Sequence, residues 1–218
     1  MNVGRILWLV KKEAALEWRN RSALTSMLVY VIGASFIVYY AFEGHITFQV
    51  WSAIFWIIAL FSAINTIGKT FDKEVTQRFY YLRTVIPPVE LILSKLIYNA
   101  FLVFIFELVI FAEMSLFFGI QVENTPIFLL TLLLGGVGIS NLFTLFATIT
   151  ARTGNVVLLS VLGFPIILPL LLLILRLTGL SDVEVLADDR WSNVGAVAAL
   201  DAITLVLSVV LFPYLWSE

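Results

Sequence analysis

The sequence contains no cysteine and a single histidine, and only 13% of its 218 residues are charged. Without cysteine there is no disulfide framework, no cysteinyl zinc site and no thiol nucleophile. Because His45 is the only histidine, neither a serine–histidine–aspartate set nor a closed metal site is suggested, and we expect no catalytic residue and no metal. The scarcity of charge excludes an ordinary soluble domain, in which about 25% of residues are charged.

What the sequence has in excess is apolar residues, at 61% of the chain. A transmembrane helix needs about 20 consecutive apolar residues, and short alternating strands of the barrel type are not visible. We therefore expect an all-α polytopic membrane protein with a single domain over residues 1–218. Six apolar runs are long enough to be transmembrane helices: 23–42, 48–68, 91–118, 127–150, 156–175 and 194–216.

The basic residues are distributed unevenly between the two sides of these runs. Eleven of the thirteen lie before the first run, around the segment between the second and third runs, or between the fourth and fifth. Only Arg176 and Arg190 fall on the other side. The positive-inside rule makes the lysine- and arginine-rich side cytoplasmic, so both termini are predicted to be cytoplasmic.

Residues 3–21 have helical periodicity, with an apolar arc and a basic arc. The apolar arc comprises Val3, Ile6, Leu7, Val10, Ala14 and Trp18, and the basic arc comprises Arg5, Lys12 and Arg19. This pattern is typical of a helix that lies on the membrane, where basic side chains meet anionic headgroups. The alternative is a charged flank that only fixes the topology.

A second amphipathic helix is predicted at 71–86, within the only sizeable cytoplasmic loop. Its apolar residues recur every three or four positions: Phe71, Val75, Phe79, Leu82 and Ile86. Pro87 and Pro88 end it, and a proline at a first helical position is expected to start the third run. The helix could lie passively on the bilayer or present its side chains to a soluble partner.

Four polar residues lie inside the apolar runs: Glu107, Glu113, Asn141 and Asp201. Such residues are costly in lipid and should face other helices or water. They are interpreted either as parts of a proton or substrate path, or as hydrogen-bonding groups and neutralised carboxyls between helices. For Asn141 the packing role is favoured.

The fourth run carries small residues at strict four-residue spacing: Gly136, Ser140, Thr144 and Thr148. Such a ridge lets another helix approach closely, either within the chain or from a second copy. In the fifth run Pro165 and Pro169 remove backbone hydrogen bonds, which predicts a bent helix or a partly re-entrant segment.

Four segments, together with the order of the elements, resemble the type-2 ABC exporter permeases. They are WSAIFWIIALF at Trp51–Phe61, PVELILSKLIYN at Pro88–Asn99, FPIILPL at Phe164–Leu170 and FPYLW at Phe212–Trp216. More narrowly, the whole chain resembles the heme exporter protein B family of the cytochrome c maturation system. It departs from many relatives in having no glycine between Phe71 and Leu82.

The resemblance implies a separate cytoplasmic ABC ATPase subunit that binds ATP, and makes 71–86 the coupling helix that receives its motion. The ATPase-coupling residues would be Phe71, Asp72, Val75, Arg78, Phe79 and Leu82. A phosphate-binding loop within this chain is not expected, because the loosely similar Ala63–Thr70 follows no strand and has one glycine.

The resemblance also implies heme as a possible cargo, with no cofactor bound directly by this chain. Its expected partners are heme-handling membrane proteins, a periplasmic heme chaperone, a second copy of the chain and membrane lipid, but no nucleic acid. The expected location is the bacterial inner membrane. Two other functions stay open: a proton-coupled secondary transporter that uses Glu107 and Asp201, and a passive scaffold for heme-handling proteins.

Overall fold

The computed structural model describes residues 2–19, 21–68, 86–119, 122, 124–151, 157–179 and 187–217. In this part of the chain all regular structure is helical, which confirms the all-α class. The helices are α1 Val3–Arg19, α2 Arg21–Ala41, α3 Phe48–Ile67, α5 Pro88–Phe118, α6 Thr125–Ala151, α7 Val157–Gly179 and α8 Ala187–Ser217. Of the predicted helix 71–86, only Ile86 is described, and its side chain is buried.

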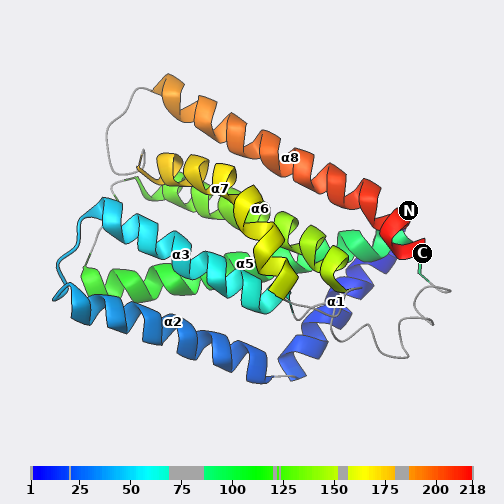
Figure 1. Ribbon diagram of the computed structural model, residues 1–218, viewed down its shortest axis with the longest axis horizontal. Helices are drawn as coiled ribbons and strands as arrows, with labels where there is room; N and C mark the ends of the chain where they lie inside the picture. Colours follow the sequence, from blue (N-terminus) through cyan, green and yellow to red (C-terminus); the bar gives the residue numbers. More distant parts are fainter. Residues whose placement is uncertain are drawn as a thin grey trace.

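Six of these helices form an elongated bundle, and α1 lies at an angle to them at one end (Figure 1). The N- and C-termini lie at this same end of the bundle. That placement agrees with termini on one side of a membrane. Which side is cytoplasmic stays a prediction from the distribution of basic residues.

Among the described residues, four helical segments are long and apolar enough to cross a membrane: Phe48–Ile67, Pro88–Phe118, Thr125–Thr150 and Trp191–Leu215. Shorter apolar stretches occupy Met27–Ala41 and Gly163–Gly179. The expected polytopic membrane protein is therefore supported, whereas the count of six spans stays a prediction.

Several helices begin earlier than the apolar runs that predicted them. The helix α5 begins at Pro88 rather than at residue 91, with Pro88 in its first turn as expected, because a proline there sacrifices no helical hydrogen bond. The helix α8 begins at Ala187 rather than at residue 194. Its first turn holds Asp188 and Asp189, and acidic residues are favourable beside the positive end of a helix dipole.

The fifth apolar run forms one helix through both of its prolines. Pro165 and Pro169 lie inside α7, which is helical from Val157 to Gly179. Its ribbon bends along its length in Figure 1. A bend is expected because each proline removes one backbone hydrogen bond and crowds the preceding turn.

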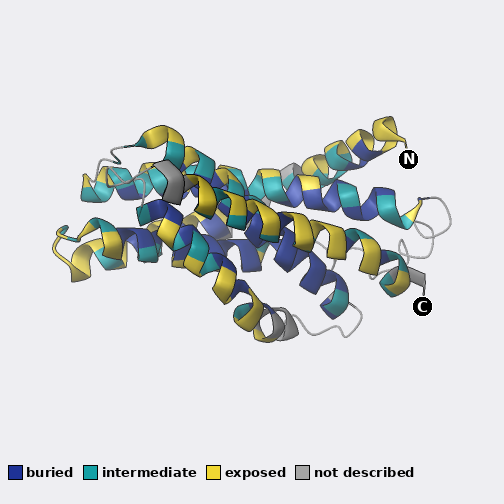
Figure 2. Ribbon diagram, turned by 90° about the horizontal axis from the view of Figure 1, so that it is seen from above, coloured by how far each residue is buried: buried dark blue, intermediate teal, exposed yellow. Residues whose placement is uncertain are grey.

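The helix α6 forms the centre of the bundle and packs against α3, α5, α7 and α8. The close approach of α3 and α7 to α6 depends on glycines. A Cβ added at Gly135 would collide with the ring of Trp56 on α3, and one added at Gly163 of α7 would lie 2.7 Å from Cε1 of Phe143 on α6. Buried residues gather inside the bundle, and exposed ones cover its outside (Figure 2).

The outside of the bundle is strongly apolar. Large exposed side chains on α2 and α8 include Val29, Ile37, Ile203, Val206 and Val210. In water such a surface would drive aggregation, whereas hydrocarbon is a suitable solvent for it. The distribution of apolar residues, inside and outside alike, is that of a membrane protein.

The helix α1 covers Val3–Arg19, which is two residues shorter than predicted, and it packs against α5. Its apolar residues are divided between two faces. Ile6 and Leu9 are buried, whereas Val3 and Leu7 are 63% and 54% exposed. The predicted single apolar arc is thus split, because protein contact rather than lipid alone takes up one side of the helix.

Candidate polar site around helix α6

The predicted functional residues fall into two groups in the structure. The proposed ATPase-coupling residues Phe71, Asp72, Val75, Arg78, Phe79 and Leu82 lie outside the described residues. All four polar residues of the apolar runs and all four members of the small-residue ridge are described. Most of these eight lie on α6 or against it.

Glu107 of α5 is fully buried and lies against α6. Its neighbour is Gly136, at which an added Cβ would be 2.7 Å from Glu107 Oε2 and 3.3 Å from Oε1. Neither carboxyl oxygen has a hydrogen-bond partner within the described part of the chain. The glycine therefore makes the space that the carboxyl group occupies.

Asp201 of α8 lies against α6 in the same manner. It is 7% exposed, and both of its carboxyl oxygens lack a hydrogen-bond partner among the residues described. A Cβ added at Gly138 would collide with Asp201 Oδ1 and would also lie 2.7 Å from Leu170 of α7. Two acidic side chains from different helices thus occupy the spaces beside two glycines of one helix.

Asn141 and Ser140 lie one turn further along α6. Both are buried, and the Asn141 Nδ2 and Ser140 Oγ atoms have no partner in the described residues. Ser140 follows Gly136 by four positions and Asn141 follows Gly138 by three, so each shares a helix face with one of the two glycines. The sequence identified these residues, but it could not show which acid lies beside which.

The rest of the small-residue ridge also lies inside the protein. Thr144 Oγ1 accepts a hydrogen bond of 2.9 Å from Asn99 Nδ2 of α5, and the Thr148 hydroxyl donates to the Thr144 carbonyl at 2.8 Å. Gly136 and Thr144 thus both meet α5. Among its described contacts, this ridge packs within the chain.

Glu113 differs from the two carboxyls beside α6. It is only partly buried, and its Oε2 atom accepts a hydrogen bond from the Ser35 hydroxyl of α2 at 3.4 Å. It lies two turns beyond Glu107, on the way to the C-terminal end of α5. The structure does not bring Glu113 together with Asp201 or Asn141 through any hydrogen bond between described residues.

A second polar cluster joins α1 to the start of α5, and the sequence patterns did not reveal it. Arg5 Nη1 lies 3.1 Å from Glu90 Oε2, and the Asn2 backbone N–H donates to Glu90 Oε1 at 2.8 Å. Further along, Glu13 Oε1 lies 3.3 Å from Lys12 Nζ and 4.0 Å from Lys95 Nζ. Because Lys95 is fully buried, this pairing holds α1 against α5.

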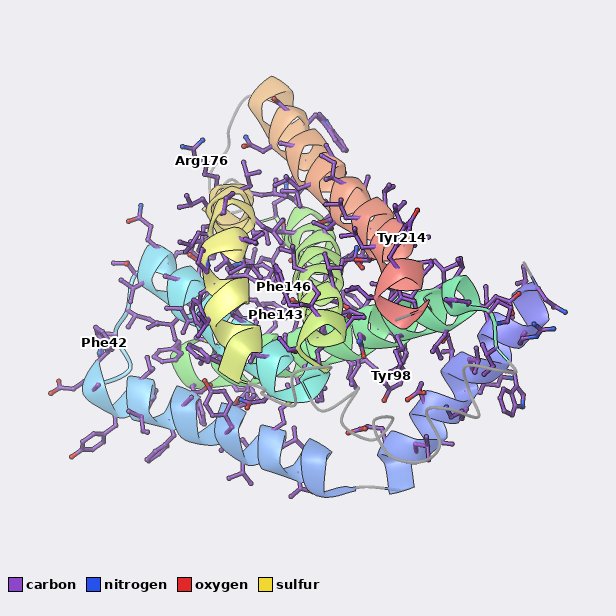
Figure 3. All side chains as sticks on the ribbon, turned by 45° about the vertical axis from the view of Figure 1, so that its right-hand side comes forward. Phe42, Tyr98, Phe143, Phe146, Arg176 and Tyr214 are labelled. Carbon is purple, nitrogen blue, oxygen red and sulfur yellow. The ribbon has the colours of Figure 1, made fainter. Side chains whose placement is uncertain are left out.

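The side chain of Tyr98 belongs to the same junction. It lies on α5 toward the end of the bundle that carries α1 (Figure 3), and it is 6% exposed. The signal that could have revealed the cluster is Lys95 inside the predicted span 91–118, with Glu90 directly before that span. Charges in such positions require protein partners.

An aromatic cluster fills the other end of the bundle. Trp51 of α3 stacks on Phe48 and Phe55 and meets Phe111 of α5 and Phe128 of α6 edge-on or at a tilt. Within the described residues, no group of three or more histidine, cysteine or acidic side chains could hold a metal ion. The described interior is made of packing surfaces and isolated polar groups.

Long apolar helices that enclose a few polar side chains, with an apolar outer surface, define an integral membrane protein. The family model described as "CcmB protein" matches residues 5–214, which is nearly the entire chain. The chain therefore belongs to the CcmB family, that of heme exporter protein B. No curated protein matches the chain as a relative.

Family membership gives the coarse function. The chain is a membrane subunit of the heme exporter that serves cytochrome c maturation, and it works in a membrane complex with other proteins of that system. The resemblance found in the sequence is thus confirmed at the level of the family.

Proposed function

We propose that this chain is the permease subunit of an ABC-type complex. It couples ATP hydrolysis by a separate ATPase subunit, of the CcmA kind, to heme export or to the release of a heme-loaded periplasmic chaperone. The observation that carries this proposal is the match of the CcmB family model over residues 5–214. Catalysis belongs to the partner, and this chain acts as a transporter subunit.

The two helices that flank residues 71–86 support the proposal that this segment is the coupling helix. The preceding helix α3 ends at Ile67 and the following helix α5 begins at Pro88, both toward the end of the bundle that carries α1 and the two termini (Figure 1). If the basic side is cytoplasmic, an ATPase would meet this end.

The helix α5 supplies a rigid connection from that end to the interior. Its first turns are tied to α1 through Glu90 and Lys95, and its middle places Glu107 against Gly136 of α6. A displacement applied at Pro88 would therefore be shared with α1 and α6. Shifts of packed helices of this kind are a common way to transmit a conformational change.

The cargo and the assembly follow from the same proposal. Heme is the cargo or the ligand of a partner chaperone, two copies of the chain form the membrane part, and heme-handling membrane proteins complete the complex. The complex lies in the bacterial inner membrane with both termini of this chain cytoplasmic.

The test is association with the ATPase subunit of the same system in lipid. The variant that carries both Phe79→Asp and Leu82→Asp should lose ATPase binding and the change in ATP hydrolysis that the wild-type chain causes, because charge replaces the apolar contacts of the predicted helix. Sedimentation of the ATPase with proteoliposomes and phosphate release would be measured.

The matched control is Phe42→Asp. Phe42 is 46% exposed and lies at the opposite end of the bundle, as Figure 3 also indicates, so this variant should bind the ATPase normally. If the Phe79 and Leu82 double variant assembles and stimulates ATP hydrolysis normally, the coupling role of 71–86 is wrong. If the wild-type chain neither binds nor affects the ATPase, a proton-driven transporter or a passive scaffold becomes the better description.

A further inference from the structure

The carboxyl group of Glu107 lies inside the protein, and no described residue neutralises it. It is 0% exposed, and neither oxygen has a hydrogen-bond partner in the described part of the chain. The contact at 2.7 Å from an added Cβ at Gly136 shows that the carboxyl lies directly against the backbone of α6. A side chain at position 136 would compete with the carboxyl group for this space.

The helices around Glu107 carry almost no charge. The helices α3 and α6 contain no charged residue, and the one charged residue of α2 is Arg21 at its first position. An ionised carboxylate at this depth would therefore lack a counter-charge from three of its neighbouring helices. The cost of burying such an isolated charge is several kcal/mol or more.

The charged residues of α1 and α8 do not change this conclusion. The basic groups of α1 meet α5 at Glu90 and near Lys95, and Lys95 precedes Glu107 by about 18 Å along the helix axis. From α8, the buried titratable group is Asp201, which is itself acidic. The remaining titratable or charged groups on α8 and α5 are Asp188, Asp189, Arg190, Tyr214, Tyr98 and Glu113.

Asp201 repeats the arrangement on another side of α6. Gly136 and Gly138 are two residues apart, so their Cα–Cβ directions differ by about 200°. Glu107 and Asp201 consequently approach α6 from nearly opposite sides, with its backbone between them. Each acid has an unpartnered polar group one turn away on the same face of α6, Ser140 for Glu107 and Asn141 for Asp201.

The chemistry of this arrangement selects the ligand. Heme carries two anionic propionates, and the carboxyl groups of Glu107 and Asp201 offer no cationic partner for them, while the described interior offers no cluster of metal-binding residues. A proton needs only a carboxyl oxygen and a change in water access. We propose that Glu107, with Asp201 as a second group, is a proton-exchange site that holds a proton in the packed arrangement and releases it when water reaches α6.

This inference goes beyond the proposed permease function and does not require the ATPase. Its first test is chemical modification of the purified wild-type chain in liposomes with dicyclohexylcarbodiimide, an apolar reagent that modifies protonated carboxyl groups. Peptide mass spectrometry would locate the product. We expect modification of Glu107 and Asp201 at neutral pH, and loss of the Glu107 product in Glu107→Gln.

Glu90 is the internal control, because it is also buried, at 5% exposure, but is paired with Arg5. Burial alone would make both glutamates equally reactive, whereas a bound proton distinguishes Glu107 from Glu90. Equal modification of the two residues, or an unmodified Glu107 in the folded chain, would overturn the proposal.

The second test separates exchange from a permanently neutral packing group. Infrared difference spectra of the wild-type chain between acidic and alkaline pH should show a protonated carboxyl band that disappears at alkaline pH and shifts in deuterated water. The band should be reduced in Glu107→Gln. A protonated carboxyl band that neither responds to pH nor shifts in deuterated water would assign Glu107 a structural role only and refute the exchange site.

Discussion

Trp56 shows how one residue can join distant parts of the chain. Its side chain is 1% exposed, and its indole N–H donates to Thr178 Oγ1 at 2.9 Å, across 122 positions of sequence. Its ring also occupies the space beside Gly135. A buried indole N–H without an acceptor is unfavourable, so the threonine hydroxyl satisfies a group that lipid could not.

Replacing Thr178 by valine should destabilise the protein by about 1 kcal/mol, because the shape is kept while the acceptor for Trp56 is lost. Unfolding of the purified protein in detergent, followed by tryptophan fluorescence, would measure this. Thr178→Ser keeps the hydroxyl and should lose much less. Equal effects of the two substitutions would show that the methyl group matters and the hydrogen bond does not.

The importance of Glu107 was visible in the sequence, but its neighbour in the structure was not. The cost of a carboxyl group in an apolar run made this position stand out from the sequence. Its location against Gly136 could not be predicted, since a glycine at four-residue spacing from Ser140 only indicates that some helix approaches closely. The identity of that helix is decided by packing.

At the scale of elements, α1 is best described together with the first turns of α5. Its buried face contains Ile6 and Leu9, and its polar contacts are with Glu90 and Lys95. The amphipathic pattern predicted a helix at this place, and a helix is present from Val3 to Arg19. The contact with α5 was not predictable, because periodicity does not distinguish a lipid-facing arc from a protein-facing one.

The pairing of Arg5 with Glu90 can be tested by exchanging the charges. Glu90→Arg should loosen α1, because two guanidinium groups would then face each other, whereas the double exchange Arg5→Glu with Glu90→Arg should restore docking. A cysteine placed at the fully buried Leu9 would report on this by its rate of maleimide labelling. We expect a several-fold faster rate in the single variant than in the parent.

The native chain has no cysteine, so the introduced thiol is the only one labelled. Arg5→Lys keeps the positive charge and serves as the conservative control. If the double exchange labels as fast as Glu90→Arg alone, the ion pair does not hold α1, and apolar packing of Ile6 and Leu9 accounts for its position.

At the scale of the whole molecule, the bundle has two chemically different ends. One end carries α1, both termini and the polar junction with α5, and the other carries the aromatic cluster around Trp51 (Figure 1). The distribution of basic residues predicts that the end with α1 is cytoplasmic, whereas the polar junction with α5 was not visible in the sequence patterns. The four long apolar helices agree with a membrane protein. The other two of the six predicted spans would be α2 and α7, whose apolar stretches are shorter.

Single cysteines labelled with a membrane-impermeant maleimide would test the orientation. We expect His45→Cys, in the turn between α2 and α3, to react in intact cells, and Lys11→Cys on α1 to react only after permeabilisation, because the positive-inside rule predicts that the basic end is cytoplasmic. The cysteine-free parent gives the background. The reverse pattern would invert the topology and place the segment 71–86 out of reach of a cytoplasmic ATPase.

The class of protein, the positions of most helices and the family were predictable from the amino-acid sequence alone. Apolar runs such as 48–68 and 127–150 correspond closely to α3 and α6, because hydrocarbon forces each span to satisfy its own backbone hydrogen bonds and so makes helix length a local property. The family is likewise carried by the order of segments along the chain.

Which polar groups meet, by contrast, depends on how the helices pack. The sequence marked Glu107, Asp201 and the packing residue Gly136, but it did not show that Glu107 meets Gly136 or that Asp201 meets Gly138. It also did not reveal the pairs Arg5 with Glu90 and Trp56 with Thr178. These contacts join residues far apart in the chain. They depend on how the helices rotate and pack against one another, and such rotation follows from the fit of many side chains at once rather than from any local pattern.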